Sequence, residues 1–299
     1  MFRNAIAVSR QYTQPVILSR RASSGKCSSS IGSFVVINDE GWIVTAGHII
    51  EQIKKLNDET LEARDREQRE AAIRNDSGLD LKERRRQLVK LGRPKDDATD
   101  RYSVVWGQYP GAQLVDAAFL QAVDLGIGRL DPFIPGLIKS YPLFKDPSKD
   151  FEQGTSLCKL GFPFHYITPS WDDRQGQFTI PPESLNLAMF PMEGIFTRTQ
   201  ILQVPLGSPL PKYPLMRVET SSPGLRGQSG GPIFDTKGTI WAIQCNTQHL
   251  PLGFDPPVPG SKRGEKEHQF LNLGLGVHPE TIFGLLRERG VNNFQISPY

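Results

Sequence analysis

Short apolar runs separated by turn residues make up most of this chain. Gly, Pro, Asn and Asp stand between many of the runs, a pattern typical of an all-β sandwich or barrel. The expected strands cover 34–37, 42–45, 102–106, 117–123, 127–130, 156–160, 195–203, 215–219 and 239–244. A final run at 279–289 spaces Ile282, Leu285 and Leu286 along one helical face and predicts a C-terminal helix.

One segment, 51–101, departs from this pattern with a high density of Glu, Lys, Arg and Asp. A turn at 75–78 divides it into two runs rich in helix formers. Opposite charges recur four residues apart, as in Glu62 with Arg66 and Glu70 with Arg74. We therefore expect a solvated helical hairpin inserted between strands. It is either a charged surface insertion without a specific role or a docking element for a partner protein.

The beginning of the chain is basic. No acid precedes Asp39, and the cations before it are Arg3, Arg10, Arg20, Arg21 and Lys26. This composition fits a transit peptide, but the apolar residues at 15–18 favour a first β strand over 5–18. There is no apolar stretch of secretory length. We expect a cytoplasmic protein, with a mitochondrial or other organellar location as the alternative.

The composition limits the classes of partner. With 38% hydrophobic and 22% charged residues, the chain has the balance of a soluble globular protein. A formal net charge of +3 is too weak to argue for nucleic acid, and no apolar run is long enough to span a bilayer. Cys27, Cys158 and Cys245 are too few for a disulfide framework, so we expect a reducing compartment and buried thiols. We expect no metal, cofactor, nucleic acid or membrane.

The most informative motif is the run 226–232, Arg-Gly-Gln-Ser-Gly-Gly-Pro, which contains Ser229. Acyl transfer through serine needs a hydroxyl exposed at a sharp bend and N–H groups aimed at the developing oxyanion. The glycines permit the dihedrals and the close approach of substrate that such a bend requires. Taken alone, the run is either a nucleophile turn or an ordinary Gly-rich turn between strands.

Two further motifs favour the nucleophile. His48 ends the run 41–48, where a β-rich stretch closes in a turn of small residues. Asp124 opens an alternating apolar strand at 123–130. The order His, Asp, Ser supplies a base, its orienting carboxylate and a nucleophile. Asp116 also lies in an apolar strand and is the rival candidate for the acid.

These three blocks resemble those of the trypsin/chymotrypsin-like serine peptidases, nearest to the high-temperature-requirement branch. The matching segments are Thr-Ala-Gly-His at 45–48, Asp-Leu-Gly-Ile-Gly-Arg-Leu at 124–130 and Gly-Gln-Ser-Gly-Gly-Pro at 227–232. The resemblance covers most of the chain outside its insertions. It implies an all-β fold of two antiparallel six-stranded Greek-key barrels. The first would occupy 1–150, with the insertion at about 51–101, and the second 151–299, with the C-terminal helix.

The resemblance also implies roles for individual residues. His48 would be the general base, Asp124 its orienting acid and Ser229 the nucleophile, with the N–H groups of Gly227 and Ser229 forming the oxyanion hole. Gln228 stands where secreted relatives carry an acid that captures a newly freed N-terminus. A neutral amide cannot form that ion pair, so we expect no activation by N-terminal cleavage.

The substrate pocket implied by the resemblance carries no charge at its floor. Counting back from Ser229 places Pro223 there, where relatives specific for Arg and Lys carry an acid. The expected wall is Gln244, Cys245 and Asn246, so an uncharged substrate side chain fits best. Two long connections, 164–192 and 250–269, flank the expected cleft; their aromatic side chains either anchor the loops or contact substrate.

The function implied is that of an intracellular serine endopeptidase that acts on proteins or peptides and is regulated by a partner. With about ten residues after the terminal helix, we expect no appended peptide-binding (PDZ) domain. The alternatives are a catalytically silent scaffold or binding protein with this fold, or a serine esterase using the same chemistry.

Overall fold

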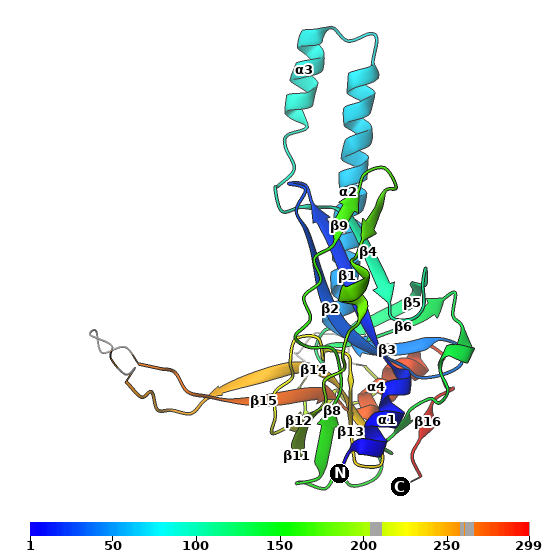
Figure 1. The fold of residues 1–299 in the computed structure, drawn as a ribbon, viewed down its shortest axis with the longest axis vertical. Coiled ribbons are helices and arrows are strands. Elements are labelled where there is room, and N and C mark those ends of the chain that lie inside the picture. Colours follow the sequence, from blue (N-terminus) through cyan, green and yellow to red (C-terminus); the bar gives the residue numbers. More distant parts are fainter. Residues whose placement is uncertain (204–210, 258–259, 261–265, 299) are drawn as a thin grey trace.

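Two β sheets form the body of the molecule in the computed structural model, which describes residues 1–203, 211–257, 260 and 266–298 (Figure 1). The first sheet holds six antiparallel strands in the order β4-β1-β2-β3-β6-β5. Their bounds are β1 Thr13–Ala22, β2 Cys27–Val36, β3 Trp42–Ala46, β4 Thr99–Trp106, β5 Gln113–Leu120 and β6 Leu125–Asp131. Every strand of this sheet precedes residue 132.

The second sheet follows in the chain and closes on itself. Its antiparallel strands run in the order β13-β8-β11-β12-β15-β14, and a further pairing of β13 with β14 completes the ring. Their bounds are β8 Ser156–Lys159, β11 Met192–Ile201, β12 Met216–Thr220, β13 Pro232–Phe234, β14 Ile240–Pro251 and β15 Phe270–Val277. Two short strands, β7 Leu143–Phe144 and β16 Gln295–Ile296, add parallel pairs at the β14 edge.

The predicted all-β fold is therefore confirmed. Of the two predicted six-stranded barrels, the second is closed by strand pairing, whereas the first sheet shows no pairing between its edge strands β4 and β5 among the described residues. The remaining short elements are a hairpin of β9 Ser170–Asp172 with β10 Gln177–Thr179 and two 3₁₀ turns, Pro135–Leu137 and Pro182–Leu185. The predicted C-terminal helix is confirmed as α4 Pro279–Glu288, which buries Ile282, Leu285 and Leu286. Of the connection 250–269, residues 258–259 and 261–265 lie outside the described part.

One apolar cluster runs through both sheets and fixes how they meet. It includes Phe34 and Trp106 of the first sheet, whose rings pack edge to face at 5.3 Å. It continues to Phe144 beside the second sheet and to Phe283 of α4, whose rings are 5.5 Å apart. Because one continuous core joins the two halves, the residues at their junction are held in a fixed relation.

The beginning of the chain corrects one expectation. Residues 5–12 belong to a helix, α1 Arg3–Tyr12, and the first strand begins only at Thr13. The buried residues Ala5, Ser9 and Tyr12 are spaced four and three apart, which is a helical period rather than a strand period. The Tyr12 hydroxyl donates to the Gly238 carbonyl at 3.3 Å, so α1 lies against the second sheet.

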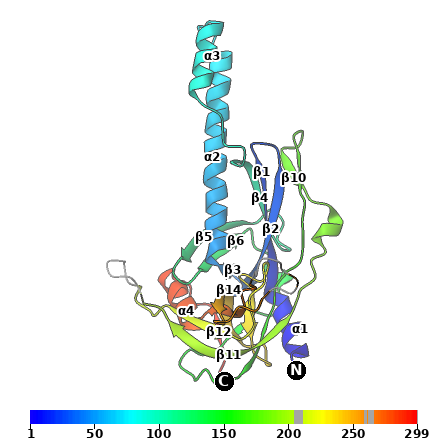
Figure 2. The ribbon, with the colours of Figure 1, turned by 90° about the vertical axis from the view of Figure 1, so that its left-hand side faces the viewer.

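The charged insertion is a helical hairpin, as predicted. Its first part runs alongside the first sheet, and its far end projects beyond both sheets (Figures 1 and 2). We call it the arm; it consists of α2 Gly47–Asn75 and α3 Leu81–Lys90. With 29 residues, α2 is roughly 43 Å long. Two boundaries differ from the expectation, because α2 begins before residue 51 and residues 99–101 belong to β4.

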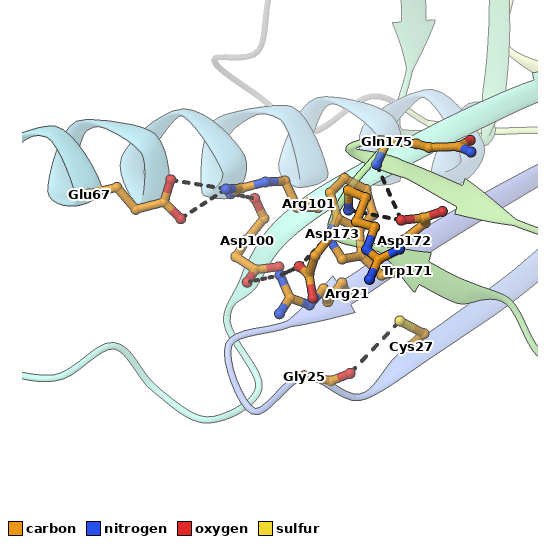
Figure 3. Close-up of polar contacts among 11 residues, drawn as sticks. Arg21, Gly25, Cys27, Glu67, Asp100, Arg101, Trp171, Asp172, Asp173 and Gln175 are labelled. Atoms are coloured by element: carbon orange, nitrogen blue, oxygen red, sulfur yellow. Dashed lines mark hydrogen bonds and ion pairs between the residues drawn. The ribbon is translucent and has the colours of Figure 1, made fainter.

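The base of the arm is tied to the body by charged contacts (Figure 3). Both carboxylate oxygens of Glu67 accept from Arg101 of β4 at 3.0 Å. Arg21 of β1 pairs with Asp100 at 3.4 Å and lies 3.9 Å from Asp173 beside the β9–β10 hairpin. The arm, the first sheet and the connection 164–192 therefore meet at one cluster.

Charge pairs along the arm follow the predicted spacing in part. Glu70 pairs with Arg74 at 3.9 Å, as expected. Arg66 pairs with Glu70 at 3.1 Å rather than with Glu62, and also donates to the Leu91 carbonyl beyond α3. The side chain that was expected to stabilise one helix thus also ties α2 to the segment that follows α3.

The three cysteines are free thiols. Cys158 and Cys245 are buried, as expected, and burial raises the pKa of Cys158 to about 11 and that of Cys245 to about 12. Cys27 is only half-buried, contrary to the expectation. Among the described residues, no helix combines the length and the apolar character needed to cross a membrane.

Candidate active site

His48 lies at the start of α2, directly after the buried strand β3. The helix can begin there because Gly47 lets the backbone approach Asp124 closely. A Cβ on Gly47 would lie 3.0 Å from the Leu125 nitrogen and 3.1 Å from the Asp124 carbonyl carbon. The Gly47 N–H donates to the Asp124 carbonyl at 2.9 Å. The strand-to-helix turn and the residue before β6 are thus joined backbone to backbone.

Asp124 and His48 form a close side-chain pair. The Asp124 carboxylate lies 2.9 Å from His48 Nδ1 and accepts from the His48 backbone N–H at 2.7 Å. The second bond places a carboxylate on the unpaired N–H groups of the α2 N-terminus, a position that favours negative charge. With Nδ1 engaged, the other ring nitrogen, Nε2, is left to face a reacting group. The imidazole is half-exposed and the carboxylate is mostly covered.

Asp116, the rival for the acid, lies elsewhere. Its carboxylate is 3.2 Å from Arg129 on the neighbouring strand. Asp116 and Asp124 both have positive φ, of 53° and 60°, so backbone strain alone does not separate them. Contact with the imidazole does, and it singles out Asp124.

Ser229 is held in a tight turn by groups from both sheets. Gly227 and Gly230 adopt φ of 95° and 86°, values that glycine reaches without strain. Ser33 of β2 donates its backbone N–H to the Ser229 carbonyl at 2.8 Å and its hydroxyl to the Gly227 carbonyl at 2.7 Å. On the other side, Gly230 donates to the Gln244 carbonyl of β14 at 2.7 Å.

The backbone N–H groups of this turn fall into two sets. Those of Gln228, Gly230 and Gly231 donate to protein carbonyls at 2.9, 2.7 and 2.9 Å. Within the described part of the chain, those of Gly227 and Ser229 have no protein acceptor. The two unpaired donors are the pair predicted from the sequence for the oxyanion hole. Unpaired N–H groups beside a serine are suited to hold a developing negative charge.

His48 and Ser229 line two adjoining cavities at the junction of the sheets. One, of about 570 Å³, is also lined by Phe164, His165 and Tyr166 of the connection 164–192. The other, of about 620 Å³, brings the remaining candidates together and is lined by Asp124, Pro223, Gln244, Cys245 and Asn246. All the side chains proposed for the catalytic unit and the pocket therefore gather at one place.

One contact of the expected unit is missing from the described residues: the Ser229 hydroxyl makes no hydrogen bond with His48. Catalytic hydrogen bonds are often long or poorly aligned before substrate binds. The Asp–His half of the unit is thus formed, while the His–Ser half has both partners on the same cavities without the bond.

Gln228 is fully buried beneath the turn, and its amide is satisfied at both ends. Its Oε1 accepts from the Leu225 N–H at 3.0 Å, and its Nε2 donates to the Phe190 carbonyl at 3.2 Å. The amide holds the turn with contacts that need no ammonium group.

Sequence reasoning missed the residues that support the turn from the first sheet. Ser33 fixes the Gly227 carbonyl, and Thr45 of β3 donates to the Ser33 carbonyl at 2.7 Å. Both lie in apolar strands, where a small polar residue gives no signal of its own. Their role depends on a turn that follows almost 200 residues later, at a separation of 194 for Ser33 and Gly227.

No family model and no curated protein matches this chain. Solved structures do match. The HtrA-type protease AlgW with a tripeptide is 16% identical over 96% of this chain and 63% of its own, with a TM-score of 0.49. The Rv3671c protease from M. tuberculosis in its active form is 13% identical over 98% and 86%, with a TM-score of 0.46. The serine endoprotease from Yersinia pestis is 14% identical over 97% and 66%, with a TM-score of 0.46.

This chain thus spans less than two thirds of AlgW and of the Yersinia protein. The order of its strands carries the structural assignment, since two six-stranded antiparallel sheets meet where His48 and Ser229 lie. The fold is a closed six-stranded barrel beside a second six-stranded antiparallel sheet, which is consistent with the predicted two-barrel, trypsin-like fold. Matches at this level of identity and TM-score leave the question of activity to the site itself.

Proposed function

We propose that this protein is a serine endopeptidase that cleaves peptide bonds through an acyl-enzyme on Ser229. One observation carries the proposal. His48 is bonded through Nδ1 to Asp124 at 2.9 Å and shares two cavities with Ser229, whose turn presents two unpaired N–H groups. A base, its orienting acid, a nucleophile and oxyanion donors are the four parts that acyl transfer requires.

In the proposed reaction, His48 Nε2 takes the Ser229 proton as the serine oxygen attacks the substrate carbonyl. The N–H groups of Gly227 and Ser229 bind the resulting oxyanion, each contributing about 3 kcal/mol in comparable sites. His48 then gives its proton to the leaving amine, and the acyl group stays on Ser229. A water molecule, deprotonated by His48, releases the acid and restores the serine. Asp124 fixes the imidazole tautomer and stabilises the imidazolium throughout.

The same site argues that no N-terminal cleavage is needed for activity. Gln228 is uncharged, buried and bonded to the Leu225 N–H and the Phe190 carbonyl. An incoming ammonium would find no carboxylate at Gln228 and would have to break these two bonds. We therefore expect activity without prior removal of N-terminal residues.

Substrate is proposed to be a protein or peptide with an uncharged side chain on the acyl side of the scissile bond, the P1 position. The cavity beside Ser229 is lined by Pro223, Gln244, Cys245 and Asn246. None of these carries a charge that could pair with a P1 Lys or Arg, and burial keeps the Cys245 thiol protonated, with its pKa raised to about 12.

We propose that a partner protein binds the arm and regulates the site. Glu67 of α2 pairs with Arg101, whose neighbour Asp100 pairs with Arg21, which in turn lies 3.9 Å from Asp173 (Figure 3). Asp173 belongs to the connection 164–192, which lines one of the two cavities through Phe164 and Tyr166. A partner on the arm thus has a contiguous route to the cleft. The cytoplasmic location stays a prediction, as does the organellar alternative.

Incubation with a diverse peptide library, read by mass spectrometry, tests the proposal. The wild-type protein should produce internal cleavages that the Ser229→Ala variant does not. Cleavage of activated esters alone, with every peptide left intact, would favour the esterase. Identical, inactive behaviour of both proteins towards peptides and esters would favour the silent scaffold.

A further inference from the structure

A buried lysine lies behind the pocket, outside the catalytic unit. Lys159 ends strand β8, with Met192 of β11 and Ile233 of β13 as its strand partners. Its side chain points into the second barrel, and the residue is only 1% exposed. Lysine is rarely buried to this extent, because removing an ammonium from water is costly unless it is paired.

The amine of Lys159 is bonded only to neutral oxygens. It donates to the Ser222 hydroxyl at 3.0 Å, to the Pro223 carbonyl at 3.0 Å and to the Ser222 carbonyl. Within the described residues it forms no ion pair with a carboxylate. Three acceptors match the three donors of an ammonium, whereas a neutral amine has only two. The three acceptors can thus bond every N–H group of the charged form.

Neighbouring backbones leave room for this amine. A Cβ on Gly274 of β15 would collide with Lys159 Nζ and with the Ser222 carbonyl. A Cβ on Gly194 of β11 would collide with the Ser222 hydroxyl, so that hydroxyl is covered. Ser222 lines neither cavity with His48, and the Lys159–Ser222 pair is therefore not a second nucleophilic site.

One of the three oxygens that Lys159 occupies, the Pro223 carbonyl, belongs to the floor of the cavity beside Ser229. Pro223 lines that cavity, and Gly224 and Leu225 continue its lining towards the serine turn. Thr247 of β14 fixes the Gly224 N–H and carbonyl, each at 2.8 Å. The amine is therefore bonded to a rigid segment that separates it from the cavity.

We propose that Lys159 is a specificity-determining residue that excludes cationic P1 side chains. Its ammonium occupies, from inside the barrel, the Pro223 carbonyl at the floor, where a P1 Lys or Arg would need an acceptor. It also places a positive charge behind that floor in a poorly solvated interior, where like charges repel more strongly than in water. This inference rests on the proposed endopeptidase function, because it names the substrate class of the same site.

The charge of this residue depends on pH. Burial lowers the pKa of Lys159 to about 7, while the nearby Cys158 thiolate would raise it. Two of the strands packed around Lys159 carry an acid: Glu193 of β11 lies opposite Cys158, and Glu219 of β12 is paired with Arg198 at 2.9 Å. The residues that β13 and β15 place next to Lys159, Ile233 and Gly274, are uncharged. Because Lys159 loses its positive charge as pH rises above neutral, its exclusion of cationic P1 side chains should weaken.

Two peptides that differ only at P1, one with Arg and one with its uncharged isostere citrulline, test the proposal. The measured quantity is the ratio of kcat/KM for citrulline to that for Arg, from which the contribution of His48 to both rates cancels. The wild-type protein should prefer citrulline, and Lys159→Met should lower the ratio by about tenfold or more. Lys145→Met is the matched control. Lys145 is also buried, but it packs on the rings of Trp241 and Phe151 and lines neither cavity.

The wild-type protein supplies a second measurement that needs no variant. Between pH 6 and pH 9 its ratio should fall as Lys159 loses its proton. If Lys159→Met folds and its citrulline-to-Arg ratio equals that of the wild-type protein, the proposal is wrong. If that variant does not fold, a wild-type ratio that stays constant between pH 6 and pH 9 overturns the proposal instead.

If no peptide is cleaved at all, the proposed endopeptidase function is wrong, but the role of Lys159 is still open to test. Binding of p-aminobenzamidine then tests whether Lys159 excludes cations from the cavity. The probe mimics a P1 Arg. It should bind Lys159→Met at least about tenfold more tightly than the wild-type protein and the Lys145→Met control. Equal affinities would reject the role of Lys159.

Discussion

The two ends of helix α2 lie in different surroundings. At its start, His48 lines the same two cavities as Ser229, and Ile49, Ile50 and Leu56 are buried in the body. Beyond residue 60 the same helix has no buried residue, and neither has α3. A single helix thus positions a candidate catalytic base at one end and forms a solvated arm at the other. The buried first part of α2 is therefore the part that positions the site, although the helix continues without a break into the exposed part.

The largest expected effect compares the two candidate acids, Asp124 beside His48 and Asp116 beside Arg129. Asp124→Asn should lower kcat/KM by about 10⁴, because the amide no longer selects the imidazole tautomer that activates Ser229. Asp116→Asn removes a similar charge that pairs with Arg129 instead, and should leave turnover within a few fold. Steady-state kinetics on one peptide substrate measure both. The reverse ranking would transfer the acid role to Asp116.

A smaller effect compares two leucines on the same helix. Leu56 is 4% exposed and Leu61 is 53% exposed. Leu56→Ala should lower the free energy of unfolding by about 2–5 kcal/mol, since it leaves a cavity in the shared core. Leu61→Ala should change it by less than about 0.5 kcal/mol. Denaturant unfolding measures both changes, and similar losses would mean that the arm packs against the body.

The pH dependence of stability separates a buried charge from the solvated charges of the arm. Burial lowers the pKa of Lys159 from 10.5 to about 7, so between these values the unfolded chain binds a proton that the folded chain does not. Stability from this residue is therefore complete above the unfolded pKa and is lost as pH falls through about 7. From pH 7 to pH 9 the free energy of unfolding should rise by about 1–3 kcal/mol.

The measurement stops at pH 9 because the two buried thiols affect stability at higher pH. Their pKa values are raised, to about 11 for Cys158 and about 12 for Cys245, and stability from these groups is lost at higher pH. Lys159→Met should abolish the rise between pH 7 and pH 9, whereas the control Lys145→Met should retain it. Persistence of the full rise in Lys159→Met would assign it to another group.

The smallest expected effect comes from shortening the arm. Replacing residues 68–92 with a short Gly/Ser linker keeps the Glu67–Arg101 contact and should change the free energy of unfolding by less than about 1 kcal/mol. Turnover of a small peptide should persist, while regulation by a partner should be lost. Collapse of the shortened protein would show that the distal arm supports the body.

The sequence predicted the parts of the site whose signal is local. The bend around Ser229 and the small-residue turn before His48 need particular residues at fixed spacing, and both lie where expected. The choice of Asp124 over Asp116 rested on the resemblance of one strand. The two residues share positive φ, and only the contact with His48 separates them.

Features that depend on distant partners were not predictable. Helix α1 was taken for part of a strand because the apolar run at 15–18 predicted a strand that reached back to residue 5. The surface on which α1 packs, around Gly238, comes from a distant part of the chain. Lys159 looks like an ordinary strand end, because its acceptors lie 63 and 64 residues away. A sequence pattern encodes a local face, but it does not show which neighbour will cover that face.

Reaction with a fluorophosphonate probe tests the central claim most directly, namely that Ser229 is a nucleophile activated by His48. The protein of residues 1–299 should gain one adduct, which peptide mapping places on Ser229, without prior removal of N-terminal residues. Ser229→Ala and His48→Ala should each remove the labelling, and their effects should not add, since the two residues act as a unit. An adduct on another serine, undiminished labelling of His48→Ala, or no labelling of the folded wild-type protein would contradict the account.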